Sequence, residues 1–447
     1  MSARILLVSY HFYPDAAVGA RRMSELAREL LAAGHEVWAV CGDPPPERRD
    51  AALSEHIQGV HRLAIAEPVA PRPRRRVRPG AAGGQAAAKR APEVERESLQ
   101  RRVKRWYHSA EWLLDNRKSW AWHTARRIKQ LASRMRFDCV ISSGPPMAAH
   151  VAVRAVQRRL ACPWLLDLRD PWTDDKEWMA HVQSALSRRV EAALEAQCLK
   201  AATRIVTSTA PYAERLRRRY PHQQHGVETI YNGYDGPLTD LGPPPAGALR
   251  LLYAGSIYYH RNPFPLLKAL GALLERAEVN PHAVHFEMIG HCEQWQGQAL
   301  RPWLEAAGLT DQVLIRDPVP ADQVRQHMAA ANVLVNFAQR QPRQIPAKMF
   351  EYLAANRDML LLTEAGSATA ELAERAGVTA VDPDDERALA ETIWRLYQYH
   401  AMGVARPVKA ARAAPEQFSR AHQNRLWLAR IATELGAPAL TVPEPET

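Results

Sequence analysis

Short apolar runs alternate with longer segments of helical periodicity along most of this chain of 447 residues. The first run spans residues 5–10, and apolar side chains at helical spacing follow in residues 21–33. This pattern predicts a buried strand and then an amphipathic helix. Gly34 marks the end of the helix, and a second apolar run covers residues 37–40. Strand, loop, helix and strand in this order predict a βαβ unit and therefore a parallel sheet.

The same alternation fills two separate stretches of the chain. Further strands are predicted at 137–142, 164–168 and 204–209, and a second series of strands and helices opens at residue 249. A segment rich in Pro and Gly separates the two series, which is typical of a linker. We therefore expect an α/β protein with two domains, each a parallel sheet with helices on both faces. The expected boundaries are an N-terminal domain at 1–235, a linker at 236–248, a C-terminal domain at 249–410, a closing helix at 411–435 and a polar tail at 436–447.

A basic segment at residues 66–98 interrupts the N-terminal domain, and its Pro, Gly, Ala and Arg cannot bury enough apolar area for a packed core. Helical patterns follow at 99–135. They carry four tryptophans, Trp106, Trp112, Trp120 and Trp122. Twelve Lys or Arg and three Glu lie between residues 72 and 105, which gives nine of the net charge of +11. Basic and aromatic side chains over residues 72–122 suit an anionic membrane surface, with a solvated tether as the alternative. Nucleic acid is not an expected partner because no nucleic-acid-binding motif accompanies the charge.

The composition narrows the class of protein. With 47% hydrophobic and 24% charged residues, the chain matches an ordinary globular protein. No apolar run approaches the roughly 18 residues that a membrane-spanning helix needs. Tyr10 and His11 interrupt the first apolar run, unlike a signal peptide. Five cysteines without a CxxC pair argue against a disulfide framework or a zinc site, so we expect a cytoplasmic protein.

The loop from Tyr13 to Gly19 is the first candidate binding segment. It joins the first strand to a helix N-terminus, whose N–H groups and dipole suit a phosphate or a sugar oxyanion. Asp15 lies within this loop. A plain turn between strand and helix is the alternative interpretation.

A second candidate cluster follows the predicted strand 164–168, at the edge where parallel sheets bind ligands. It consists of Asp167, Arg169, Asp170 and Trp172. Two carboxylates and a guanidinium are costly to bury unless they pair with one another. They therefore either orient substrate hydroxyls or form a structural corner of ion pairs.

In the C-terminal domain, Gly255 and Ser256 follow the first predicted strand, and Gly290 and His291 end the next one. Arg261 comes shortly after the first of these turns. Its planar guanidinium can bind two oxygens of a diphosphate, and a surface arginine is the alternative.

Lys348 and Glu351 share one face of a later helix, since they are three residues apart. They are candidate ligand contacts, or else a surface ion pair. For a metal, the sequence offers no DxD between apolar strand residues and no HExxH. We therefore expect no metal site.

Six segments, in this order and spacing, resemble glycosyltransferase family 4, a retaining family of nucleotide-sugar glycosyltransferases with the GT-B fold. They are YHFYPDAAVGARRMSELARELLAAGHEV, AATRIVTSTAPYAERL, TIYNGYD, LLYAGSIYYHRNPFPLLKAL, FEMIGH and IPAKMFEYLAANRDMLLLTEAGS. ISSGPP followed by WLLDLRDPW is similar to bacterial members that build cell-surface glycans. The resemblance implies two Rossmann-like domains that face a central cleft, with the last helix returning to the N-terminal domain.

The resemblance also gives the candidate residues roles. The catalytic group would be Arg169, Asp170 and Gly19, and the acceptor-binding group Asp15, Asp167 and Trp172. The donor-binding group would be Gly255, Ser256, Arg261, Gly290, His291, Lys348 and Glu351. Two positions depart from the family pattern. Ser256 stands where the family has an Arg, and Arg343 stands at the first position of a Glu-x7-Glu pair whose second member, Glu351, would bind the donor ribose.

The function implied is sugar transfer from a nucleoside-diphosphate donor of UDP or GDP type to a sugar-, lipid-linked or small-molecule acceptor. Retention of configuration, a place in glycan biosynthesis and the absence of a cofactor are further expectations. The alternatives are a non-catalytic nucleotide-sugar-binding scaffold, which the two departures favour, and another GT-B activity such as an epimerase or an inverting transferase.

Overall fold

The computed structural model describes residues 2–66, 113–174, 184–235, 241–243, 245–258, 260–355, 357–378, 380–405 and 416–436. The basic segment from residue 67 onward, Trp106, Trp112 and the tail from 437 lie outside the described residues. Packing divides the chain into two compact units, residues 1–166 with 176–202 and residues 167–175 with 203–447. Among the described helices, none is long and apolar enough to cross a membrane.

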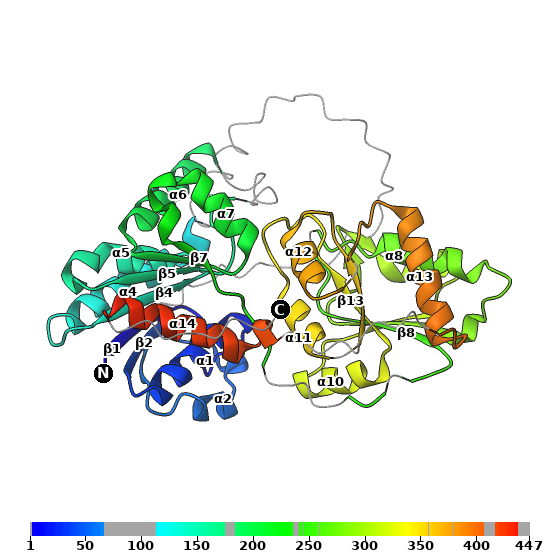
Figure 1. Ribbon diagram of the computed structural model, residues 1–447, viewed down its shortest axis with the longest axis horizontal. Helices are drawn as coiled ribbons and strands as arrows, with labels where there is room; N and C mark the ends of the chain where they lie inside the picture. The colour runs from blue at the N-terminus through cyan, green and yellow to red at the C-terminus, as the bar shows by residue number, and fades with distance from the viewer. Residues whose placement is uncertain are drawn as a thin grey trace, which may run out of the picture. The chain divides into compact units, whose positions relative to one another are not determined.

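The N-terminal half builds a seven-stranded sheet in the order β3-β2-β1-β4-β5-β6-β7 (Figure 1). Its strands are β1 (Arg4–Ser9), β2 (Glu36–Gly42), β3 (His61–Ile65), β4 (Cys139–Gly144), β5 (Trp164–Leu168), β6 (Arg204–Thr207) and β7 (Val227–Thr229). β1 pairs in parallel with both β2 and β4, so Ile5 lies between Val37 and Cys139. The strand order reverses at β1, and the crevice outside the carboxyl ends of β1 and β4 is the position where such sheets bind ligands.

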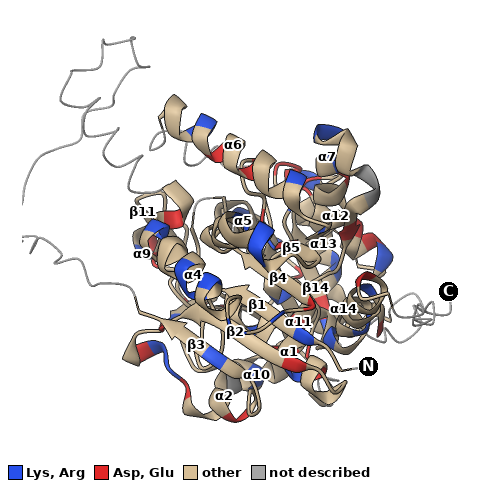
Figure 2. Cartoon of the chain, turned by 90° about the vertical axis from the view of Figure 1, so that its left-hand side faces the viewer, with Lys and Arg blue, Asp and Glu red and all other residues tan. Residues whose placement is uncertain are grey.

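Helices cover both faces of this sheet, as the sequence pattern predicts. They are α1 (Val18–Ala32), α2 (Ala51–Glu55), α4 (Lys118–Leu131), α5 (Ala148–Leu160), α6 (Ala185–Ala201) and α7 (Ala210–Arg219). Figure 2 shows α4, α5 and α6 on one face and α1 and α2 on the other. β1, β4 and β5 are buried along their length, except for the first residue of β1. Burial on both faces is usual for parallel strands covered by helices.

The C-terminal half builds a six-stranded sheet in the order β12-β9-β8-β13-β14-β15. Its strands are β8 (Leu249–Ala254), β9 (Val284–Ile289), β12 (Val313–Arg316), β13 (Val333–Phe337), β14 (Asp358–Leu362) and β15 (Ala380–Val381), with a small hairpin of β10 (Gln294–Trp295) and β11 (Gln298–Ala299). The helices are α8 (Phe264–Leu274), α9 (Leu300–Ala306), α10 (Ala321–Ala330), α11 (Ala347–Ala354), α12 (Ala368–Arg375) and α13 (Glu386–His400). The strands of this sheet pair in parallel, so the expectation of two parallel α/β sheets is confirmed.

The last helix, α14 (Arg420–Glu434), returns to the seven-stranded sheet, as expected. Arg430 donates two hydrogen bonds of 2.7 Å to the carboxylate of Glu228 in β7. Glu434 accepts one of 2.6 Å from Arg204 in β6. The end of the chain is thereby fastened to the two last strands of the sheet.

Candidate functional site

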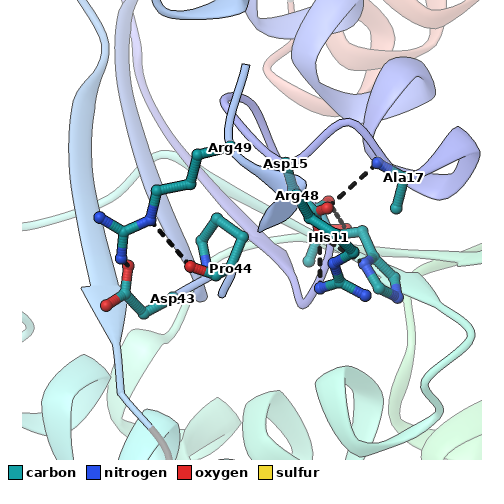
Figure 3. A network of polar contacts seen from close by, with 8 residues as sticks. His11, Asp15, Ala17, Asp43, Pro44, Arg48 and Arg49 are labelled. Atoms are coloured by element: carbon teal, nitrogen blue, oxygen red, sulfur yellow. Dashed lines mark hydrogen bonds and ion pairs between the residues drawn. The ribbon is translucent and has the colours of Figure 1, made fainter. Parts of the chain in front are cut away.

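The loop after β1 holds a buried carboxylate with three polar partners (Figure 3). One oxygen of Asp15 lies 2.7 Å from Nδ1 of His11 and 3.2 Å from Nη2 of Arg48, and the other accepts the N–H of Ala17 at 3.0 Å. Gly19 is the second residue of α1, so the loop ends at a helix N-terminus, as the sequence suggests. Asp15 is buried, whereas the side chains of His11 and Arg48 are 22% and 38% exposed. A ligand at this edge would therefore contact His11 and Arg48, with Asp15 orienting both.

Backbone hydrogen bonds join this loop to the loop after β2. The N–H of Ala16 donates to the carbonyl of Arg48 at 2.8 Å, and the N–H of Asp50 to the carbonyl of Pro14 at 2.9 Å. Arg49 in turn donates to Pro44 and Asp43. The sequence around Arg48 contains no motif that indicates a binding residue. The backbone hydrogen bonds between the two loops bring it to Asp15.

The loop after β5 is anchored by hydrogen bonds within the second unit. The Ser208 hydroxyl donates to the carbonyl of Arg169 at 2.5 Å, and the N–H of Trp172 donates to the hydroxyl of Tyr212 at 3.1 Å. Asp170 accepts a hydrogen bond of 3.0 Å from the side-chain amide of Gln344. Asp167 and Trp172 are fully buried, so in this conformation they support the loop, and half-buried Asp170 lies closest to solvent.

At the carboxyl edge of the six-stranded sheet, the ends of β8 and β9 are locked together. The N–H of Gly255 donates to the carbonyl of Ile289 at 2.7 Å, and the N–H of Ile257 to the carbonyl of His291 at 2.9 Å. Gly290 has a φ of 131°, and a Cβ there would lie 2.4 Å from the carbonyl oxygen of Gly255. Glycine is therefore required at residue 290, and the His291 ring is left exposed beside it.

Two cations converge on the same tyrosine at this edge. Arg261 Nη1 lies 3.4 Å from the hydroxyl of Tyr253 and 3.2 Å from the carbonyl of Ser256. Lys348, from the first turn of α11, places Nζ 5.8 Å from the centre of the Tyr253 ring. A Cβ on Gly255 would lie 2.6 Å from that Nζ, so the missing side chain of Gly255 makes room for the ammonium group.

Neither cation is neutralised by a carboxylate of the described residues. Within that part of the chain, neither Arg261 nor Lys348 forms an ion pair, so the alternative of a surface pair between Lys348 and Glu351 is not what the structure contains. The Nε of Arg261 is buried and has no hydrogen-bond partner there. Glu351 is exposed, one turn further along α11.

Burial has a strong effect on the charges of this cluster. It lowers the pKa of Lys348 to about 8, and the charge of Arg261 lowers it further while that of Glu351 opposes the shift. Burial also raises the pKa values of Tyr253 and Cys292 to about 12, so both stay neutral at physiological pH. The result is a compact, partly buried, net positive cluster that suits a ligand with more than one negative charge.

The donor-side residues predicted from the sequence therefore come together around Gly255, and among them Glu351 and the ring of His291 are exposed. Tyr253 was missed because a tyrosine inside an apolar strand gives no chemical signal. No group of three or more His, Cys, Asp or Glu among the described residues could hold a metal ion.

Comparisons with known proteins extend the picture. Residues 85–236 match the family model described as Glycosyltransferase Family 4, and residues 248–399 match Glycosyl transferases group 1. A search among curated proteins finds no matching sequence.

Three solved structures are similar in fold. They are a sucrose-phosphate synthase from Thermosynechococcus elongatus (16% identity, TM-score 0.60, 97% of each chain), a glycosyltransferase from Rickettsia africae ESF-5 (13%, 0.59, 97% of this chain and 99% of that one) and Anabaena HepE in complex with UDP-glucose (13%, 0.59, 97% and 99%).

Proposed function

We propose that this chain, a glycosyltransferase of the GT-B fold with a family 4 domain and a group 1 domain, moves a sugar from a nucleoside-diphosphate donor to an acceptor. The observation that carries the proposal is the pair of Arg261 and Lys348 beside Gly255. Neither has a carboxylate partner in the described part of the chain, and the Nε of Arg261 is buried without an acceptor. A diphosphate would satisfy both charges.

These residues would also serve the chemistry. When the bond from the sugar to the diphosphate breaks, negative charge develops on the leaving oxygen. Two cations already in place stabilise that charge without reorganisation, which is the usual source of rate enhancement in such a site. In this proposal Glu351, on the same helix, accepts hydrogen bonds from the donor ribose, and no divalent metal is needed.

The nature of donor and acceptor belongs to the proposal as well. The donor would be of UDP or GDP type, and the HepE structure, which holds UDP-glucose, supports a nucleotide-sugar donor. The acceptor would meet His11 and Arg48, which Asp15 orients. Retention of configuration and a place in glycan biosynthesis complete the proposal. Peripheral association with an anionic surface does not follow from these donor and acceptor residues.

Thermal shift and calorimetry with UDP, GDP and ADP test the donor site. A nucleotide at 100 times its Kd should add about 2.7 kcal/mol to the free energy of unfolding. Lys348→Met should weaken binding at least tenfold, since charged hydrogen-bond partners contribute about 1.5–3 kcal/mol. Lys268→Met, an exposed lysine of α8, is the matched control and should bind like the wild type. Equal affinity in wild type and Lys348→Met would overturn the assignment.

Turnover separates transfer from the scaffold alternative. An enzyme should release free nucleoside diphosphate from its sugar nucleotide, slowly to water and faster once an acceptor is added. A scaffold would bind the nucleotide and release none. Recovery of an epimerised sugar nucleotide would instead identify an epimerase.

A further inference from the structure

Helix α4 carries an exposed basic stripe around one tryptophan. The stripe consists of Lys118, Trp122, Arg126 and Lys129, which follow one another at helical spacing and are all exposed. Trp122 is 60% exposed, whereas Trp120, only two residues earlier, is fully buried against the sheet side of α4. The structure thus separates a tryptophan that holds the helix in place from one that the fold does not use.

Few acidic residues lie in the same part of the sequence to neutralise this positive charge. Residues 117–160, which cover α4 and α5, contain ten Lys or Arg and a single acid, Asp138. α5 packs against α4 and adds the exposed Arg158 and Arg159. In the described part of the chain, Arg126, Lys129 and these two arginines form no ion pair. Figure 2 shows the basic residues along α4.

The arrangement of Trp122 and Arg126 matches the chemistry of a lipid headgroup layer. The guanidinium of Arg126 lies 5.8 Å from the centre of the Trp122 ring. Tryptophan prefers the boundary between water and hydrocarbon, where its ring meets acyl chains and its N–H meets polar groups. Lys and Arg beside it can lay their aliphatic stems on the apolar layer and keep the charge at the phosphates.

We propose that this face of α4 and α5 docks on an anionic membrane surface, with Trp122 among the headgroups and Arg126 and Lys129 paired with lipid phosphates. The inference goes beyond the proposed function because the donor and acceptor residues lie on other elements. Such binding is reversible and weakens with salt, because exposed charges are screened within about 8–10 Å at physiological ionic strength.

Co-sedimentation of the full chain with vesicles tests the proposal. Vesicles of phosphatidylcholine alone are compared with vesicles that also contain phosphatidylglycerol, at low and at high salt. We expect binding to the anionic vesicles at low salt only. The double variant Arg126→Gln/Lys129→Gln should bind about 30-fold more weakly, as expected for two basic residues at an anionic surface. Trp122→Ala should reduce binding to the same vesicles by about tenfold.

The matched control is Lys268→Gln/Arg301→Gln, which removes two exposed charges from the C-terminal half. It should bind vesicles within twofold of the wild type, and all variants should keep their melting temperature and donor turnover. Equal weakening by both double variants would show attraction by net charge alone and overturn the assignment to α4. The proposal would also be overturned if the α4 variants bound vesicles like the wild type, or if the wild type did not bind anionic vesicles. It would be overturned as well if the wild type bound a nucleic acid but no vesicles, and the α4 variants lost that nucleic-acid binding.

Discussion

Lys348 is held partly out of water, with a second cation close by. Its pKa falls to about 8, chiefly because of burial and further because of Arg261. Lys348 is therefore still mostly protonated at neutral pH in the ligand-free protein, but it loses its proton far more readily than an exposed lysine. Residues whose pKa values are shifted by burial together with a specific neighbour concentrate in functional sites.

The affinity for a nucleoside diphosphate should therefore depend on pH. Binding needs protonated Lys348, and the bound anion raises its pKa above that of the free protein. Affinity should change little between about pH 7 and pH 8, where the terminal phosphate is already ionised, and fall above pH 8 by up to tenfold per pH unit until the pKa of the complex is reached. Calorimetry near pH 8 in buffers of different ionisation enthalpy should detect proton uptake on binding. Lys348→Met should abolish both effects, and a fall in affinity above pH 8 that survives in this variant would contradict the explanation.

Gly255 offers a way to move Lys348 without removing it. The Cβ of Gly255→Ala would lie 2.6 and 2.7 Å from the Nζ and Cε of Lys348, the mobile end of that side chain. We expect a folded protein whose nucleotide affinity falls at least tenfold. Gly271→Ala in α8, where nothing lies within 4 Å, is the control and should bind normally with a slightly higher melting temperature. Similar affinities in the two variants would argue against a ligand site at Lys348.

At the level of secondary structure, the sequence predicts interior strands well and edge strands poorly. The strand 164–168 is found as β5 with the expected bounds, because a strand buried on both faces is a continuous apolar run. β3 and β7 are missing from the sequence-based prediction, and both are edges of the seven-stranded sheet. His61 and Arg62 break the apolar pattern in β3, and β7 has only three residues.

The candidate site divides in the same way. Lys348 could be predicted as a site residue from its helical spacing to Glu351, and Arg261 from its position shortly after a predicted strand. Tyr253, His11 and Arg48 become part of a site only through contacts between distant segments, such as the pairing of β1 with β2. Residue type and local period carry no information about such contacts.

The attachment of α14 should be sensitive to one ion pair. Glu228→Gln removes the carboxylate that accepts two hydrogen bonds from Arg430. Because this pair is bidentate and partly buried, the free energy of unfolding should fall by about 1 kcal/mol. The exposed helix pair of Arg387 and Glu391 provides the control, since Glu391→Gln should leave chemical denaturation unchanged. Equal effects of the two substitutions would show that the Arg430–Glu228 pair stabilises the fold no more than an exposed ion pair does.

For the molecule as a whole, the two sheets give candidate residues at the carboxyl edges of both halves. The first half presents Asp15 with His11 and Arg48, and the second presents the cations around Gly255. The proposed division of labour is acceptor in the first and donor in the second. In this proposal, side chains would stabilise the developing charge without a bound metal ion.

Donor turnover should accordingly survive EDTA. Arg261 and Lys348 are expected to hold the diphosphate unaided, so dialysis against the chelator should change the rate less than twofold. Addition of Mg²⁺ or Mn²⁺ afterwards should not raise it. Loss of activity with EDTA and its recovery with either ion would show that a metal takes part in the reaction.

The cation pair beside Gly255 has a kinetic consequence. A sugar nucleotide carries two negative charges on its diphosphate, whereas the released nucleoside diphosphate gains a third once its terminal phosphate ionises near pH 6. In the proposed reaction, a cluster with two unneutralised cations would therefore hold the spent nucleotide more tightly than the donor. Departure of that product would be the slow step of the cycle. The enzyme would then be restrained by its own by-product, and its pace in the cell would follow how quickly a phosphatase removes that nucleotide.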